Sequence, residues 1–282
     1  MSGPIIAGTD GSTGATAAVE WAADDAARAG LPLRVVNAVY PRPSDVPRSI
    51  VLEEDVITAD ARRVLAEAEA TVRARRPFVE VSTALIEGPP PLVLRDQGQA
   101  AEEIVIGTRG LGGFAAAVLG SVSMHVAGHA HCPVVVVHPS AGPARDEITV
   151  GVDDSDACEP ALAYAFHQAG LRGATLRAVH AWQLPVHAFA PEAAYAMDDI
   201  RAAQHVVVAE RLAAWRQKYP GVDLVEDVRC AHPVDALVEA SEGSDMLVVG
   251  SHGRGALSSL LLGSVSRGVL HHARCTVAVV RS

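Results

Sequence analysis

Lysine is almost absent from this 282-residue chain. Lys218, in the segment "WRQKYP", is the only lysine among 23 Lys and Arg residues. A phosphate-binding loop of the G-x-x-x-x-G-K-[ST] type requires a lysine directly after its last glycine, whereas Lys218 follows Gln217. The sequence therefore excludes the class of nucleotide triphosphatases that depends on this loop.

Net positive charge is also lacking, since the formal charge at pH 7 is −10. Nucleic acids and anionic membranes bind best to basic surfaces, so the composition argues against both as partners. Four cysteines are too few for a disulfide framework. Because Cys132 and Cys275 each begin an apolar run, we expect them to be reduced residues of the core.

Membrane, secretion and catalytic signals are missing as well. No stretch reaches the roughly 18 consecutive apolar residues of a membrane helix, and "MSGPIIAGTDGS" lacks the basic start and apolar run of a secretion signal. We therefore expect a cytoplasmic protein. There is no G-x-S-x-G or H-E-x-x-H motif, and nothing in the sequence nominates a general base, which weakens an assignment as an enzyme.

What the chain does contain is a 17-residue pattern that occurs twice. "GTRGLGGFAAAVLGSVS" begins at Gly107 and "GSHGRGALSSLLLGSVS" begins at Gly250, 143 residues later. The same offset relates Asp10 in "AGTDGS" to Asp153 in "VGVDDS". A period of this length matches a whole domain rather than a solenoid repeat, so the chain is a tandem duplication.

Each copy alternates strands with helices. In the first copy we expect strands at 4–10, 31–40, 78–86, 102–107 and 132–138, and helices at 13–30, about 53–76, after Pro91, and about 122–130. Several strands are apolar throughout, which indicates an α/β fold with a parallel sheet covered on both faces. We expect one face of the second helix to carry Val56, Val64 and Leu65. The predicted domains are 1–140 and 146–282, with a polar linker at 138–147.

The repeated loop lies where an α/β sheet binds ligands. Gly107 and Gly250 each end a strand, and ligands bind beyond the carboxyl ends of parallel strands. The glycines let the backbone approach a ligand, and a helix is expected to begin at the G-S-V-S segment, where free N–H groups favour phosphate. Asp10 and Asp153 end the first strands on the same edge. They are candidates for ribose or metal-bound phosphate, although such aspartates are also common turn residues.

Taken together, these residues resemble the universal stress protein family, specifically its ATP-binding branch, whose signature is G-x-x-G, nine residues, then G-[ST]. Both copies match this signature, and the resemblance extends over essentially all 282 residues. It implies that each copy is a five-stranded, parallel-sheet, nucleotide-binding domain of the Rossmann-like type. In the first copy the implied site comprises Asp10, Ala38, Gly107, Arg109, Gly110, Gly120, Ser121, Val122 and Ser123. In the second copy it comprises Asp153, Ala181, Gly250, His252, Gly253, Gly263, Ser264, Val265 and Ser266.

The two implied sites are not identical. The first contains Arg109 and "FAAAVL", whereas the second contains His252, Arg254 and "LSSLLL". Asp154 in the second copy replaces Gly11 of the first, which adds negative charge beside the aspartate. These differences leave the relative affinity of the two sites open.

The resemblance implies a nucleotide-responsive regulator of stress or growth that binds ATP, with Mg²⁺ as a candidate companion ion. It also implies that the fifth strands, "CPVVVVH" and "CTVAVV", lie at sheet edges. We expect these edges to pair within one chain, and the two-domain unit to form a homodimer. The alternatives are a slow ATPase or autophosphorylating enzyme, and a dimerisation scaffold that binds no nucleotide. A metal site at His271 and Cys275 is disfavoured, because no further cluster completes the ligands.

Overall fold

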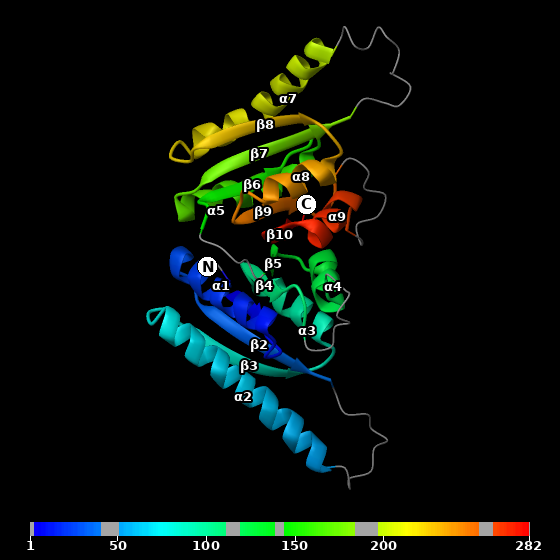
Figure 1. The fold of residues 1–282 in the computed structure, drawn as a ribbon. Coiled ribbons are helices and arrows are strands. Elements are labelled where there is room, and N and C mark those ends of the chain that lie inside the picture. The colour runs from blue at the N-terminus through cyan, green and yellow to red at the C-terminus, as the bar shows by residue number, and fades with distance from the viewer. Residues whose placement is uncertain are drawn as a thin grey trace. The chain divides into compact units, whose positions relative to one another are not determined.

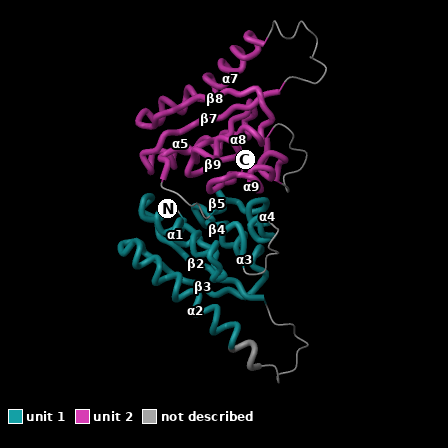
Figure 2. Tube along the Cα trace, viewed as in Figure 1, with its two compact units in different colours: residues 1–139 teal, residues 140–282 magenta. Residues whose placement is uncertain are grey.

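The structure, a computed structural model, describes residues 3–40, 51–110, 119–138, 144–183, 197–253 and 262–281, and the backbone alone at 51–55 (Figure 1). The chain divides into two compact units, Met1–Pro139 and Ser140–Ser282 (Figure 2). Each unit contains a parallel sheet flanked by helices, which confirms the predicted α/β class.

The sheet of unit 1 has the order β3-β2-β1-β4-β5, and every described pairing in it is parallel. Its strands are β1 (Ile5–Gly8), β2 (Leu33–Val39), β3 (Val81–Glu87), β4 (Glu103–Gly107) and β5 (Val134–Val137). Strands β1 and β4 are buried along their whole length, as expected for apolar strands covered on both faces. From β1, the strands β2 and β3 follow on one side of the sheet and β4 and β5 on the other, so the strand order reverses between β1 and β4.

In the part of unit 1 that the structure describes, the sheet is covered by α1 (Thr13–Ala29), α2 (Val51–Arg75), α3 (Pro90–Gln97) and α4 (Ser121–His129), and a 3₁₀ turn follows α3 at Gly98–Ala100. Helix α1 begins at the N-cap Ser12 and ends at Gly30, whose φ of 66° is the left-handed conformation that glycine adopts at low cost. Helices α1 and α2 contact each other, as do α3 and α4, so one pair covers each face (Figure 1).

Unit 2 repeats this architecture with the order β8-β7-β6-β9-β10, again parallel. Its strands are β6 (Glu147–Gly151), β7 (Thr175–Trp182), β8 (Leu224–Cys230), β9 (Met246–Gly250) and β10 (Thr276–Val280). Its helices are α5 (Glu159–Arg172), α7 (Met197–Lys218), α8 (Pro233–Ser241) and α9 (Ser264–His272), and the 3₁₀ helix η3 (Asp156–Cys158) precedes α5.

Two details of the predicted elements are wrong. Val56, Val64 and Leu65 are expected to share one apolar face, but Val56 is 66% exposed, whereas Val64 and Leu65 are buried. The cause is length: 25 residues of α2 span about 37 Å, whereas the seven residues of β3 span about 23 Å, so the first turns of the helix extend past the sheet (Figure 1). Phe78 is fully exposed and precedes β3, which begins at Val81 after a turn.

The cysteines behave as predicted, since Cys132 and Cys275 are buried and free. Burial raises the pKa of each thiol to about 12, so both remain protonated at neutral pH. Within the described ranges, no helix has the length and apolar composition needed to cross a membrane. The same part of the chain contains no group of three or more His, Cys, Asp or Glu side chains that could hold a metal ion.

Candidate functional site

The candidate residues of each unit gather at the point where the strand order reverses. Asp10 lies two residues beyond β1, and Gly107 is the last residue of the neighbouring strand β4. Asp153 and Gly250 occupy the same positions after β6 and at the end of β9. Such a reversal opens a crevice at the carboxyl edge of a parallel sheet, which is where these folds bind ligands.

Each aspartate presents its two carboxylate oxygens to different partners. The backbone N–H of Ser12 donates to Asp10 Oδ1 at 3.0 Å, and a Cβ atom placed on Gly110 would collide with Asp10 Oδ2. In unit 2, the N–H of Ser155 donates to Asp153 Oδ1 at 3.0 Å, and a Cβ atom on Gly253 would lie 2.6 Å from Asp153 Oδ2. The backbone of the repeated loop therefore passes directly against the aspartate in both units.

The ends of each loop are joined by a backbone hydrogen bond. The N–H of Gly120 donates to the carbonyl of Thr108 at 2.7 Å, and that of Gly263 donates to Ser251 at 2.8 Å. The chain thus leaves the strand end and returns to the same place before the helix begins. Arg254 and most of the apolar runs lie outside the described residues.

Glycine, rather than a polar side chain, occupies the N-cap of α4 and α9. Gly120 and Gly263 have extended backbones, and neither cap provides a side-chain hydrogen bond. The first N–H groups of a helix have no carbonyl partner within it, and together with the helix dipole they favour an anion. Ser121 and Ser264, the first helical residues, are exposed, whereas Val122 and Val265 are half-buried.

Ser123 and Ser266 have a structural contact that the sequence did not indicate. Both side chains are buried, and their hydroxyls donate to the carbonyls of Gly107 and Gly250 at 2.8 and 2.7 Å. Each bond ties the start of a helix to the end of the preceding strand. A contact between these serines and phosphate stays a prediction.

The remaining implied residues line the same edge. Ala38 and Ala181 are half-buried, and each is the second-last residue of its strand, β2 or β7. Arg109 is exposed, and its positive charge adds to burial in lowering the pKa of His138. In unit 2, His252 Nδ1 lies 3.1 Å from Ser251 Oγ. Unit 1 thus places a permanent cation where unit 2 places an imidazole.

Ser12 and Gly14 contact the candidate site residues, and the sequence analysis missed both. The Ser12 hydroxyl donates to the carbonyl of Arg109 at 3.3 Å and accepts from the N–H of Ala15 at 3.2 Å, so it links the loop to α1. A Cβ atom on Gly107 would lie 2.6 Å from the carbonyl carbon of Gly14, which shows how closely the helix start approaches the strand end. The recurrence of serine at Ser155, beside the second aspartate, was the available signal.

The whole chain is similar to universal stress proteins. The model of the universal stress protein family matches residues 1–138 and again residues 144–281. Universal stress protein Rv2005c of Mycobacterium tuberculosis is 37% identical over 297 residues, which cover 98% of this chain and 96% of the relative. Universal stress protein Rv2623 of the same organism is 37% identical over 290 residues with the same coverage. The chain belongs to the universal stress protein family.

A solved structure supports the fold over the full length. The crystal structure of a universal stress protein from Archaeoglobus fulgidus has a TM-score of 0.72, and the match covers 100% of this chain and 99% of that one. At 22% identity, this likeness shows the fold alone.

Proposed function

We propose that each unit binds one ATP molecule at its strand-order reversal, and that the protein acts in the cytosol as a nucleotide-responsive regulator of stress or growth. The observation that carries the proposal is a geometry built twice. In both units a loop glycine lies directly against the aspartate carboxylate, next to a helix whose N-cap is glycine. The same close approach recurs in both units, at the edge of the sheet where parallel α/β folds bind ligands.

In this proposal the parts of the nucleotide meet groups of matching chemistry. The loop amides and the N-termini of α4 and α9 bind the phosphates, because they offer N–H donors and positive dipole ends. Asp10 and Asp153 accept hydrogen bonds from ribose hydroxyls. The backbone at Ala38 and Ala181 lies along the adenine. Local dipoles bind the polyanion even though the chain has a net charge of −10.

Mg²⁺ fits this site as a companion of the phosphates rather than as a separate centre. The ion commonly keeps several waters and takes one or two carboxylates together with substrate phosphates. Asp10 and Asp153 are the carboxylates that would take such an ion, as the alternative to ribose hydroxyls. The ion would supply charge neutralisation for the triphosphate.

The proposal is tested on the full-length protein. Mass spectrometry of the small molecules released by heat denaturation should detect adenine nucleotide, and calorimetry after its removal should give two ATP sites per chain. Phosphate release and phosphorylated peptides, measured after incubation with Mg-ATP, separate a binding protein from a slow ATPase. If ATP does not bind at millimolar concentration, with or without Mg²⁺, the proposal is wrong.

A further inference from the structure

The turn that carries the aspartate is built differently in the two units. In unit 1, Gly11 follows the aspartate with φ of 81°, and a Cβ atom there would lie 2.9 Å from the side chain of Val64. Unit 2 has Asp154 at the corresponding position, and among the described residues it is not one of those with positive φ. The chain then forms η3, Asp156–Cys158, at the place where unit 1 already begins its first α-helix.

Arg211 of α7 bonds directly to this altered turn. Its Nη2 donates to the carbonyl of Asp154 at 2.9 Å, and its Nη1 donates to Asp156 Oδ1 at 3.1 Å and to Glu159 Oε1 at 2.9 Å. The Arg211 side chain is 20% exposed, and its partners Glu159 and Asp156 are 40% and 98% exposed, so the bond to Glu159 is the one partly shielded from water. The indole N–H of Trp215, one turn further along α7, donates to Glu159 Oε2 at 3.0 Å. Helix α7 is thus attached to the segment that follows Asp153.

A second connection reaches the other side of the same aspartate. His180 is almost fully buried, and its Nδ1 donates to the carbonyl of Val152 at 2.9 Å. Its Nε2 lies 2.9 Å from Oε1 of Gln204, a residue of α7. Asp153 stands between Val152 and Asp154, and the carbonyls of both neighbours are linked to α7. The carbonyl of Val152 is linked through His180 to Gln204, and that of Asp154 accepts directly from Arg211.

Unit 1 lacks the side chains for either connection. The positions that correspond to Arg211 and Gln204 are Ala68 and Ala61, both buried. The positions that correspond to Asp156 and Glu159 are Thr13 and Thr16. The two connections are therefore a property of the second site.

We propose that Arg211 is a positioning residue for the second nucleotide site, an inference that rests on the proposed function. Arg211 fixes the turn that presents Asp153 to the nucleotide. It also neutralises Asp156 and Glu159, two carboxylates that would otherwise repel the phosphates. The affinity of the second site therefore depends on the polar docking of α7, whereas α2 meets the corresponding turn of unit 1 through Val64, which packs against Gly11.

The test separates the two sites of the full-length chain before Arg211 is changed. Gly110→Val places a side chain against Asp10 and should remove ATP from the first site only. Gly253→Val does the same at Asp153 and should remove ATP from the second site only. Each of these two parent variants should therefore bind one ATP. Arg211→Ala should weaken Mg-ATP roughly tenfold in the Gly110→Val background, the effect of losing a hydrogen bond between charged groups. It should leave affinity unchanged in the Gly253→Val background. Arg211→Lys keeps the charge without the fork geometry and should restore part of the affinity.

Arg216→Ala is the matched control, because Arg216 also lies on α7 and pairs with Glu226 at 2.7 Å, away from the turn. It should leave the affinity of the second site unchanged. Hydrogen exchange of the nucleotide-free protein gives a readout that does not depend on ATP. Amides of residues 152–158 should exchange faster in Arg211→Ala than in Arg216→Ala.

The outcomes distinguish this inference from the proposed function. Faster exchange together with weaker ATP binding at the second site alone supports both. Unchanged affinity at the second site, with only a lower melting temperature, overturns the positioning role and leaves the proposed function intact. Parent chains that bind no ATP overturn the proposed function and the inference with it. If Arg211→Ala does not fold, Arg211→Lys carries the same comparison, and unchanged affinity there contradicts the proposal.

Discussion

Asp10 and Asp153 combine two roles that the sequence left as alternatives. One oxygen of each carboxylate accepts from a backbone N–H two residues later, as in a turn that needs no ligand. The other oxygen faces the loop glycine, at the edge where a nucleotide is proposed to bind. Because the two roles use different oxygens, substitutions can separate them.

Asp→Asn and Asp→Ala at either position should therefore differ in stability and agree in binding. Asparagine retains an oxygen for the turn, so it should keep the melting temperature, whereas alanine should cost about 1 kcal/mol of unfolding free energy. Both changes remove the charged acceptor and should weaken ATP by about 1.5–3 kcal/mol, or roughly tenfold or more. Thermal melting and calorimetry measure the two effects. Constant ATP affinity in both variants would leave these aspartates as turn residues only.

Gly110→Ala and Gly253→Ala should each remove ATP binding from their own unit. Neither glycine is among the described residues with positive φ, so alanine causes no backbone strain there. Its methyl group would instead displace the carboxylate of Asp10 or Asp153. Calorimetry should show one site lost in each variant and both lost in the double variant.

Gly221→Ala is the control for these substitutions, because nothing lies within 4 Å of a Cβ atom at that position. It should keep both sites. Two intact sites in the double variant would contradict the role proposed for the loop.

At the scale of elements, the sequence predicts what depends on local pattern. The strands and helices follow from apolar periodicity, and the site loop follows from glycines that recur at a fixed spacing. The attachment of the second helix could not be predicted in this way. In unit 1, Asp24 of α1 pairs with Arg75 and Arg76, whereas unit 2 stacks Trp215 of α7 on Phe166.

These contacts lie at positions where the two copies differ, so the repeat carries no information about them. The buried hydroxyl of Ser123 was missed for another reason. Its partner is the carbonyl of Gly107, and sequence does not show which way a side chain turns toward a backbone group.

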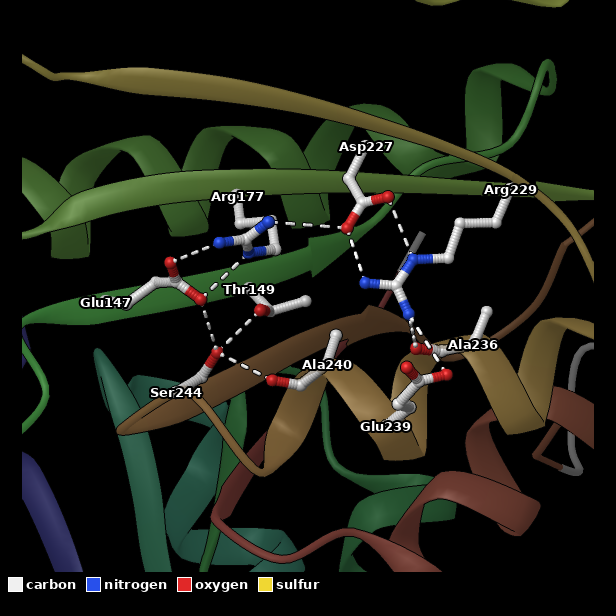
Figure 3. A network of polar contacts seen from close by, with 9 residues as sticks. All are labelled: Glu147, Thr149, Arg177, Asp227, Arg229, Ala236, Glu239, Ala240 and Ser244. Atoms are coloured by element: carbon white, nitrogen blue, oxygen red, sulfur yellow. Dashed lines mark hydrogen bonds and ion pairs between the residues drawn. The ribbon is translucent and has the colours of Figure 1, made fainter. Parts of the chain in front are cut away.

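A ladder of charged side chains crosses the sheet of unit 2 and ends on α8 (Figure 3). Glu147 pairs with Arg177 at 2.8 Å, Arg177 with Asp227 at 3.4 Å, Asp227 with Arg229 at 2.6 Å, and Arg229 with Glu239 at 3.4 Å. It thereby links β6, β7, β8 and α8. Hydrogen bonding to Arg229, with the further charge of Arg177, holds the pKa of Asp227 below its usual value.

Asp227→Asn should destabilise the protein near neutral pH by about 1–3 kcal/mol, since it leaves two partly buried guanidinium groups without their shared carboxylate. A carboxyl group whose pKa is lowered by folding stabilises the protein above its unfolded pKa of about 3.9. That stabilisation disappears as pH falls through the lower folded pKa. The difference in melting temperature between parent and variant should therefore have its largest value above about pH 5 and shrink toward zero in stronger acid.

Asp198→Asn is the control for the ladder, because Asp198 is 94% exposed and pairs with Arg201 on the surface at 3.3 Å. It should change the melting temperature little at any pH. An Asp227→Asn difference that stays constant from neutral to strongly acidic pH would show that the charge of Asp227 is not what stabilises unit 2.

At the scale of the whole molecule, duplication has preserved one architecture while the contacts around it diverged. The positions in unit 1 that correspond to Glu147, Asp227 and Arg229 are Pro4, Ala84 and Ile86, so the ladder has no counterpart there. Asp10, Gly107, Gly110 and Gly120 of the first proposed site correspond to Asp153, Gly250, Gly253 and Gly263 of the second, so these residue types are unchanged. This contrast is what we expect if both sites keep one ligand class while unit 2 adds its own control through α7.

The duplication also leads to a prediction about assembly. Within unit 1, β5 is the end strand of the order and pairs with β4, and β10 is the end strand of unit 2 and pairs with β9. Apart from Thr276, every residue of both strands is apolar, and an uncovered apolar edge favours association. We predict that these edges pair with each other within one chain.

Residues 1–139 and 140–282, produced separately, should then each self-associate, whereas the mixed halves should form a one-to-one complex. Light scattering coupled to size-exclusion chromatography measures these masses, with the full-length chain as reference. Halves that stay monomeric, alone and mixed, at concentrations of hundreds of micromolar would show that the edges are covered in some other way.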